Sequence, residues 1–195
     1  GCHRVLVCTG DTQTRMVNPK DRAMQVIVGD AGTATIVEAG KDTVPFYFKT
    51  VGSHYGDLII PAGGYRLSCS AETSVETADD AGNIRSKNDL FMDGMEVMNF
   101  ALTEVPPAVS TLLELSGYAK DEINLFAMHQ PNKLILDHLA ISMEIPEEKM
   151  PVGLQHTGNT ASATIPLLLS VLKGRGMDFS AMHKVLCCGF GMGLS

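Results

Sequence analysis

Residues 125–132 read LFAMHQPN and residues 156–162 read HTGNTAS, and the expected fold and chemistry of the chain both start from these two stretches. The run at 124–128 is short and apolar, as a buried strand is, so His129 lies where that strand ends. In open α/β sheets, ligands bind beyond the carboxyl ends of the strands. Asn159 follows later beside a glycine, in a sequence typical of a turn or a helix N-cap.

Helical and strand-like patterns alternate around these stretches. The second half of the chain is expected to contain, in order, a helix over 95–115 that Pro106 and Pro107 break or kink, a strand at 124–128, a helix at 133–143, a helix at 162–172 and a strand at 184–188. In the first half, strands are expected at 4–9, 35–39 and 44–51. This alternation predicts a layered α/β fold.

The composition is that of a globular protein with a net negative charge. The 195 residues are 45% hydrophobic and carry a net charge of −7, which argues against general binding to nucleic acid or to an anionic membrane. No apolar run has transmembrane length and no signal peptide is recognisable, so the cytoplasm is the expected compartment. The five cysteines show no CxxC spacing, and for the vicinal pair Cys187 and Cys188, which lies in an apolar run, buried thiols are expected rather than a disulfide.

His129 and Asn159 are ordinary residues when each is taken alone. A histidine after an apolar run is most often structural, and an asparagine beside a glycine most often belongs to a turn. Together, a neutral imidazole N–H and a carboxamide N–H₂ can donate to one carbonyl oxygen that gains negative charge. Uncharged donors polarise this oxygen without readily protonating a neighbouring carbanion. The pair therefore predicts a site for enolate formation.

Other kinds of site find less support. A hydrolase triad is not indicated, because the chain has no GxSxG motif. No metal site is expected, because His129, His138 and His156 show neither the HExxH pattern nor a paired spacing. The run GFGMG at 189–193 is either a tight turn after a strand or a place where backbone N–H groups approach a ligand, and both interpretations stay open.

Three motifs together resemble the thiolase superfamily, and within it the 3-oxoacyl-acyl-carrier-protein synthase III group. They are HQPN at 129–132, GNTAS at 158–162 and GFGMGLS at 189–195. Further support comes from NPKDR at 18–22, GDAG at 29–32, PAGG at 61–64 and MDGMEV at 92–97. The resemblance spans nearly the whole chain, and the motifs are specific as a set although each alone is weak.

This resemblance implies a five-layered αβαβα fold made of two similar halves. On that basis, residues 1–68 correspond to the end of the N-terminal half, and residues 93–195 correspond to the C-terminal half that carries the histidine and the asparagine. The polar residues 69–92 between them are expected to form a linker or surface excursion. The chain is expected to be the C-terminal part of a longer protein.

The family catalyses a decarboxylative Claisen condensation of an acyl-CoA with malonyl-acyl carrier protein, an acyl transfer of fatty acid biosynthesis. The resemblance implies that His129 and Asn159 are the catalytic donors that hold the malonyl thioester carbonyl. It implies that the backbone N–H of Met192 helps to form an oxyanion hole and that Asn132 lies near the pantetheine tunnel. Met95 and Met98 stand where many relatives place substrate-binding residues, a polar residue and a phenylalanine.

The resemblance also implies which molecules bind. No resident cofactor or metal is implied, and the substrates are coenzyme A thioesters and phosphopantetheine-linked groups. The implied partners are acyl-CoA, acyl carrier protein and, in the intact protein, a second copy of the chain. Neither nucleic acid nor membrane is an expected partner.

Several features depart from the family pattern. The family's nucleophilic cysteine belongs to the first half, upstream of residue 1, and none of the five cysteines here stands at a strand-to-helix start that could lower its pKa. The chain alone is therefore expected to be inactive. The residues at Met95, Met98 and Pro131 leave open a specialised relative that makes a polysaccharide-linked acyl group or a secondary metabolite. A non-catalytic thiolase-fold partner protein is the alternative from a different class.

Overall fold

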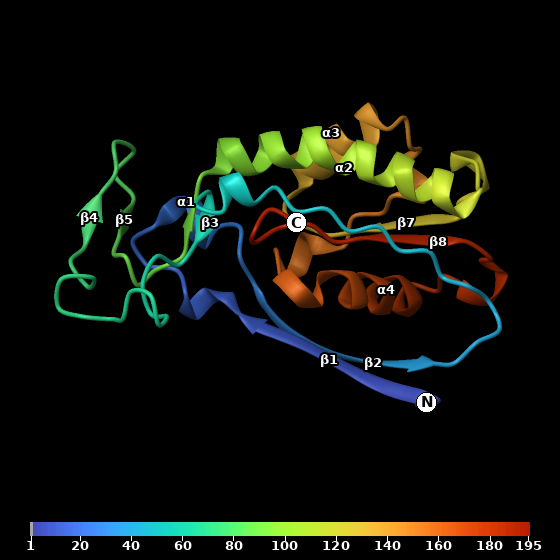
Figure 1. Cartoon of the computed structure of the whole chain (residues 1–195), viewed down its shortest axis with the longest axis horizontal. Helices are drawn as coiled ribbons and strands as arrows, with labels where there is room; N and C mark the ends of the chain where they lie inside the picture. Colours follow the sequence, from blue (N-terminus) through green and yellow to red (C-terminus); the bar gives the residue numbers. More distant parts are fainter. Residues whose placement is uncertain (1) are drawn as a thin grey trace.

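A computed structural model describes residues 2–195 and shows helices and sheets stacked in alternating layers (Figure 1). The strands are β1 (Arg4–Thr12), β2 (Asp30–Glu38), β3 (Leu58–Ile59), β4 (Thr77–Ala78), β5 (Ile84–Arg85), β6 (Phe91–Met92), β7 (Leu125–Met128) and β8 (Val185–Cys188), and the α-helices are α1 (Arg22–Gln25), α2 (Gly94–Ser116), α3 (Lys133–Ser142) and α4 (Thr164–Gly174). In Figure 1, α2 and α3 form the upper layer, the β7–β8 sheet lies beneath them, α4 lies below that sheet, and the β1–β2 sheet is lowest. The described residues thus form four layers in the order helix, sheet, helix, sheet, which confirms the expected layered class.

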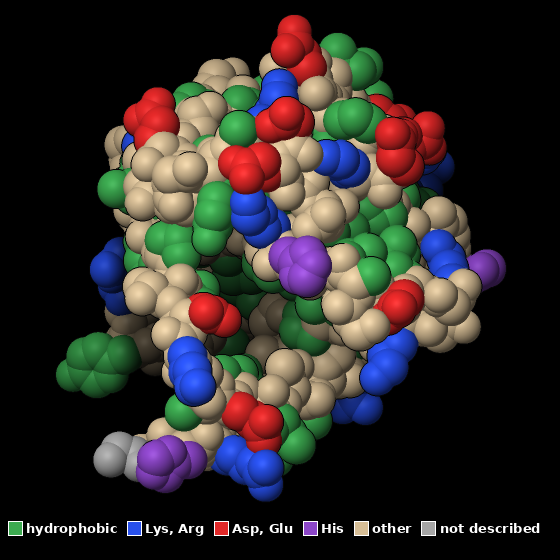
Figure 2. Space-filling view, turned by 90° about the vertical axis from the view of Figure 1, so that its right-hand side faces the viewer, with side chains coloured by type: hydrophobic (Ala, Val, Ile, Leu, Met, Phe, Trp, Pro, Cys, Tyr) green, Lys and Arg blue, Asp and Glu red, His purple; other side chains and the backbone are tan. Residues whose placement is uncertain are grey.

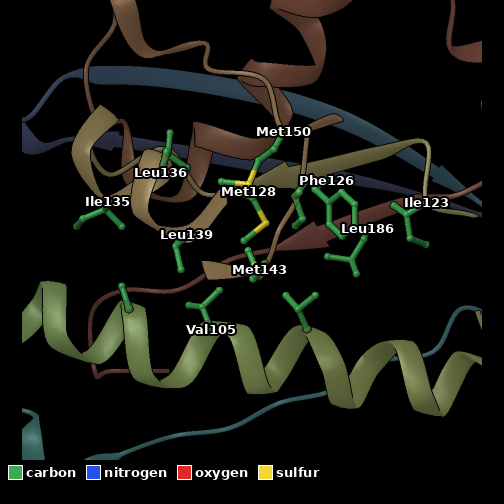
Figure 3. Packing of buried hydrophobic residues seen from close by; sticks show 13 residues of the cluster. Val105, Ile123, Phe126, Met128, Ile135, Leu136, Leu139, Met143, Met150 and Leu186 are labelled. Carbon is green, nitrogen blue, oxygen red and sulfur yellow. The ribbon is translucent and has the colours of Figure 1, made fainter. Parts of the chain in front are cut away.

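The β7–β8 sheet is the centre of the fold. Its strands are parallel, with Met128 opposite Cys188. All four residues of β7 are buried, because helices cover both faces of the sheet. Phe126 and Met128 pack on the side of α2 and α3 (Figure 3), whereas Leu125 and Ala127 pack on the side of α4. A strand covered on both faces is apolar throughout, and this explains why its sequence shows a continuous apolar run rather than alternation.

Helix α2 is continuous over 23 residues, although two prolines lie inside it. The break expected at Pro106 and Pro107 does not occur, since the helix runs through both, whereas the alternative, a kink, stays a prediction. A proline inside a helix costs about 3 kcal/mol, and here the burial of Val105 and Val109 against α3 and β7 opposes that cost. Within residues 2–195, no helix is both long and apolar enough to span a bilayer.

Strands β1 and β2 form an antiparallel ribbon that runs from the pair Arg4–Glu38 to the pair Thr12–Asp30. Both strands are longer than the sequence pattern indicates. The ribbon contacts α4 and the short 3₁₀ turn at Ala161–Ala163, which begins the helix. Its far end exposes several large apolar side chains, namely Val5, Leu6, Val7, Ile36 and Val37. The ribbon therefore joins the body of the molecule mainly at the end that lies near residue 11.

The strand expected at 44–51 is not formed. The segment is extended, but it pairs with no other strand within residues 2–195. Its alternation places Phe46 and Phe48 together, and their rings stack with centroids 6.1 Å apart. The segment is held instead by an ion pair between Lys49 and Glu104. Alternation alone does not produce a strand when no neighbouring backbone completes the hydrogen-bond ladder.

Residues 69–92 contain a small hairpin, β4–β5, that projects from one end of the molecule (Figure 1). Arg85 of this hairpin pairs with Asp21 and Asp79, each at 2.8 Å. Lys20 pairs with Glu76 at 2.6 Å. These contacts tie the excursion to the segment around α1. The expected division of the chain into two halves on either side of it stays a prediction.

Candidate functional site

A large open cavity lies between α2, the carboxyl ends of β7 and β8, and the extended segment 42–50. Its volume is about 1990 Å³, and its wall includes His129, Asn159 and the turn at 189–192. Figure 2 shows one face of the molecule hollowed near its middle, with hydrophobic side chains inside the hollow. Concave, largely apolar walls with a few polar groups are typical of small-molecule sites. The cavity is therefore the candidate site of the chain.

His129 lies at the end of β7, where the sequence predicts it. Its backbone N–H donates to the carbonyl of Cys188 at 2.8 Å, which extends the β7–β8 ladder by one bond. The side chain is 9% exposed, and its ring meets the Phe190 ring edge-on with centroids 5.2 Å apart. Nδ1 lies 2.7 Å from the hydroxyl of Thr164. Burial lowers the pKa of His129 to about 4, so the imidazole is neutral at pH 7.

Asn159 lines the same cavity and has a fixed amide. Its Oδ1 accepts from the backbone N–H of Ala161 at 3.0 Å. Because Oδ1 is engaged in this way, the N–H₂ group is the part of the side chain left to donate to a ligand. Ala161 itself has φ of 45°, an unfavourable conformation for a residue with a Cβ, and such strain is common at functional sites.

The backbone of Asn159 is held by the segment before β2. Its N–H donates to the carbonyl of Ile27 at 2.9 Å, and its carbonyl accepts from the N–H of Gly29 at 2.8 Å. The approach requires glycine, because a Cβ at Gly29 would lie 1.7 Å from the carbonyl oxygen of Thr157. Gly158, next to the asparagine, has φ of 65°, in the left-handed region. Gly29 of the GDAG motif and Gly158 of the GNTAS motif therefore both allow the same close approach of the two segments.

A carboxylate from the end of β1 adds a third attachment. Asp11 Oδ2 accepts from the backbone N–H of Ser162 at 3.1 Å and also from its hydroxyl. These hydrogen bonds fix the start of the turn that leads into α4. The Asn159 side of the cavity is consequently supported by residues from the first 30 positions of the chain.

The glycine-rich turn after β8 forms another part of the cavity wall. Leu194 is buried and donates from its N–H to the carbonyl of Gly191 at 2.8 Å, which closes the turn. Met192 lies in the middle of the turn, with its side chain 54% exposed. Within residues 2–195, no backbone carbonyl accepts from the N–H of Met192. This N–H can therefore be offered to a ligand, as its predicted part in an oxyanion hole requires.

The predicted substrate-binding residues divide into two kinds. Asn132 lines the cavity, and its Oδ1 accepts from the N–H of Ile135 at 2.9 Å, which caps α3. Met95 is 83% exposed on the first turn of α2, and Met98 packs against the hydrophobic core between α2 and β7. Neither methionine is among the residues that line the cavity. Their predicted contact with substrate therefore gains no support from the geometry and stays a prediction.

The cysteines offer no activated thiol. Cys188 lies at the end of β8 beside the cavity, and desolvation raises its pKa to about 11. Desolvation also raises the pKa of Cys187. Cys2, Cys8 and Cys69 are exposed, and none of them lines the cavity. Cys187 and Cys188 line the cavity but have raised pKa values, and the other three cysteines lie outside it, so none of the five is placed to attack a substrate held beside His129.

Some features of the site were not predicted from the sequence. Thr164 and Phe190 contact the His129 ring. Thr164 lies two residues beyond GNTAS, and Phe190 lies within GFGMG, where the glycines rather than the phenylalanine were expected to matter. Thr164 belongs to the first turn of a helix, where a threonine commonly serves the backbone. A group of metal-ligand type also exists on the surface, where one atom each of His54, Asp57 and Glu96 lies within 4.8 Å of the others.

Two family descriptions match the sequence. The description "3-Oxoacyl-[acyl-carrier-protein (ACP)] synthase III" matches residues 1–54, and its C-terminal counterpart matches residues 113–195. Beta-ketoacyl-[acyl-carrier-protein] synthase III of Streptococcus pyogenes serotype M5 is 33% identical over 194 residues. That alignment covers 97% of this chain and 56% of the relative, so the chain spans little more than half the length of such relatives.

Solved structures show the same similarity. A crystal structure of a 3-oxoacyl-(acyl-carrier-protein) synthase III superposes with a TM-score of 0.94 at 39% identity, over 98% of this chain and 58% of the other. A 3-oxoacyl-(acyl-carrier protein) synthase from Burkholderia xenovorans LB400 gives a TM-score of 0.82 at 36% identity, over 98% of this chain and 54% of the other. The four layers described above are thus arranged as in these enzymes.

Proposed function

The chain belongs to the 3-oxoacyl-[acyl-carrier-protein] synthase III family, and from this we propose that its cavity holds and decarboxylates a malonyl thioester. The intact protein would be a condensing acyltransferase of fatty acid biosynthesis. Its substrates would be an acyl-CoA and malonyl-acyl carrier protein, and it would act as a homodimer. This chain would supply the part of the site that generates the carbon nucleophile.

The observation that carries the proposal is that two uncharged donors, His129 and Asn159, line one cavity. His129 is neutral at pH 7 because of its burial, and the amide of Asn159 is fixed with its N–H₂ group available. Donors that are held in place before the substrate arrives stabilise developing negative charge without reorganising. A cationic histidine at this point could protonate the carbanion that the reaction must preserve.

The proposed chemistry balances without a metal or redox cofactor. The bond between the malonyl carboxylate and the α-carbon breaks, carbon dioxide leaves, and the electron pair forms an enolate whose oxygen accepts from the two donors. The enolate carbon then attacks the carbonyl of an acyl thioester, a carbon–carbon bond forms, and the thiolate is expelled. The N–H of Met192 would donate to the oxyanion of that second step, and Asn132 would contact the pantetheine arm.

The acyl thioester must be carried by a thiol other than the five in this chain. The raised pKa of Cys188 and the exposed positions of Cys2, Cys8 and Cys69 support this part of the proposal. We expect that the 195-residue chain by itself forms no covalent acyl-enzyme from an acyl-CoA. Mass spectrometry of the purified chain after incubation with acyl-CoA tests the point, and a stable acyl adduct on any of its cysteines would contradict it.

Release of carbon dioxide from malonyl-acyl carrier protein, by the protein that contains this chain, tests the decarboxylation. His129→Ala and Asn159→Ala should each lower kcat roughly 100- to 1,000-fold, the usual effect of removing one donor to an oxyanion. His138→Ala is the matched control, because His138 is exposed on α3 and does not line the cavity. A folded wild-type protein that releases no carbon dioxide would favour a non-catalytic partner protein.

A further inference from the structure

The ring of His129 presents one nitrogen to Thr164 and has the other available for a ligand in the cavity. A neutral imidazole carries a single N–H, so it donates through Nδ1 or through Nε2 but not through both. Only the tautomer with the proton on Nε2 can polarise a carbonyl if Nδ1 is occupied by the protein. What Thr164 does with its hydroxyl proton therefore decides whether His129 is a donor or an acceptor toward the cavity.

The hydroxyl of Thr164 has two neighbours and one proton. Oγ1 lies 2.7 Å from Nδ1 of His129 and 3.0 Å from the carbonyl oxygen of Ala161. Hydroxyl donors prefer distances near 2.7–2.8 Å, whereas N–H donors prefer about 2.9–3.0 Å. The shorter contact is thus typical of an O–H donor, and the contact to Ala161 is long for one.

The carbonyl of Ala161 does not need the hydroxyl proton. It already accepts from the backbone N–H of Thr164, which closes the 3₁₀ turn before α4. In the alternative arrangement Nδ1–H donates to Oγ1 and the hydroxyl donates to Ala161, so the O–H donor would have only the longer contact of 3.0 Å. The shorter contact to Nδ1 therefore favours a hydroxyl proton that points to the histidine.

Other donors cannot replace the hydroxyl at Nδ1. Pro131, two residues after the histidine, has no backbone N–H. The amide of Gln130 is held by other groups, since one N–H of its Nε2 donates to the carbonyl of Met128 and its Oε1 accepts from the N–H of Gly153, each at 2.9 Å. Thr164 is itself 4% exposed, so water does not compete freely for its hydroxyl.

We propose that Thr164 is a positioning residue that donates its hydroxyl proton to Nδ1 of His129 and so places the imidazole proton on Nε2, toward the cavity. The tautomer is inferred from the two distances at Oγ1, whereas its value for decarboxylation rests on the function proposed above. Thr164 stands at the first residue of α4, and Leu168 one turn later is buried against β7, so the hydroxyl is carried on a rigid element. The N–H of His129 is then aimed before any substrate binds.

Nitrogen-15 NMR of the labelled 195-residue chain at pH 7 tests the tautomer directly. In the wild-type chain, Nδ1 of His129 should resonate as an unprotonated nitrogen and Nε2 as a protonated one. Thr164→Ser keeps the hydroxyl and should keep this pattern. Thr164→Val keeps the shape and removes the donor, so the signals should shift toward the other tautomer or a mixture. A wild-type ring with its proton on Nδ1 would overturn the proposal, as would a Thr164→Val pattern identical to that of the wild type.

A kinetic test separates positioning from folding. In the protein that contains the chain, Thr164→Val should lower kcat for malonyl decarboxylation roughly 10- to 100-fold, as loss of a group that orients a functional histidine does elsewhere, with little change in KM. Thr164→Ser should restore most of the rate. Equal rates in the serine and valine variants would contradict the role. If the wild-type protein releases no carbon dioxide, the proposed function fails, while the NMR result still decides the tautomer.

Discussion

The two donors of the proposed site are held in opposite ways. His129 extends a buried strand, and its contacts come from elements that belong, like β7, to the C-terminal part of the chain. Asn159 lies in a turn whose backbone bonds to Ile27 and Gly29. The histidine is therefore positioned by the core around it, and the asparagine is positioned by a distant segment. The two donors thus depend on different segments of the chain. A substitution in one of these segments should displace one donor more than the other.

The largest effect is expected from a Cβ at residue 29, which would disrupt the backbone contact that positions Asn159. Gly29→Ala brings that atom to 1.7 Å from the carbonyl of Thr157, so one of the two backbones must move. We expect the free energy of unfolding in urea to fall by at least about 3 kcal/mol and malonyl decarboxylation to be lost. The matched control is Gly32→Ala, whose Cβ meets nothing closer than 3.9 Å. Equal stability of the two variants would contradict the claim that the close approach of Gly29 to Thr157 positions Asn159.

The His129 side should respond to acid. Its pKa is about 4 in the folded chain and about 6.5 when unfolded, because burial disfavours the charged ring. The unfolded chain therefore binds the extra proton between these values, so stability is fully present above pH 6.5 and is lost toward pH 4. The loss amounts to about 3 kcal/mol from this group.

The measurement for this prediction is a series of urea unfolding curves from pH 7.5 to pH 4. His129→Gln cannot titrate, so the difference in unfolding free energy between it and the wild type should shrink by about 3 kcal/mol over the range. Curves that stay parallel would mean that the histidine is solvated rather than buried.

A smaller effect is expected where β1 meets the turn before α4. Asp11→Asn weakens both hydrogen bonds to Ser162, and partial exposure to solvent limits the cost to about 1 kcal/mol. Ser162 stands between Asn159 and Thr164, so decarboxylation should fall, and the NMR signals of the His129 ring should stay closer to their wild-type positions than they do in Thr164→Val. Asp121→Asn is the control, since Asp121 is an exposed carboxylate that does not line the cavity. A shift of the His129 signals in Asp11→Asn alone would show that the two sides are coupled.

An effect of about the same size concerns Asn132, which caps α3 beside the histidine. Asn132→Ala should lower the unfolding free energy by about 1 kcal/mol, whereas Asn132→Ser should restore most of it, because serine also caps helices. Steady-state kinetics then separate the two roles of the residue. If Asn132 contacts the pantetheine arm, KM for malonyl-acyl carrier protein rises in both variants. An unchanged KM in Asn132→Ser would reduce Asn132 to a helix cap.

The local elements of the C-terminal part could be predicted well from the sequence. The apolar run before His129 becomes β7, the amphipathic segment after it becomes α3, and the run around Leu186 becomes β8. Each of these is decided by composition and periodicity within a few residues. The predictions failed where contacts between distant residues determine the local structure. Helix α2 continues through Pro106 and Pro107 because one of its faces is buried. The alternating segment at 44–51 forms no strand because no other strand pairs with it.

The same division runs through the site. The sequence by itself determined that His129 ends a buried strand, that Asn159 lies in a glycine-bearing turn and that both are uncharged donors, since these follow from residue type and near neighbours. Only the tertiary structure decided that the two share a cavity, that Asp11 secures Ser162 from 151 residues away, and that Thr164 faces Nδ1 of the histidine. Hydrogen bonds and burial depend on which groups lie close together in space. A pattern that repeats every two or every 3.6 residues indicates a strand or a helix, but it does not indicate which distant residues come into contact.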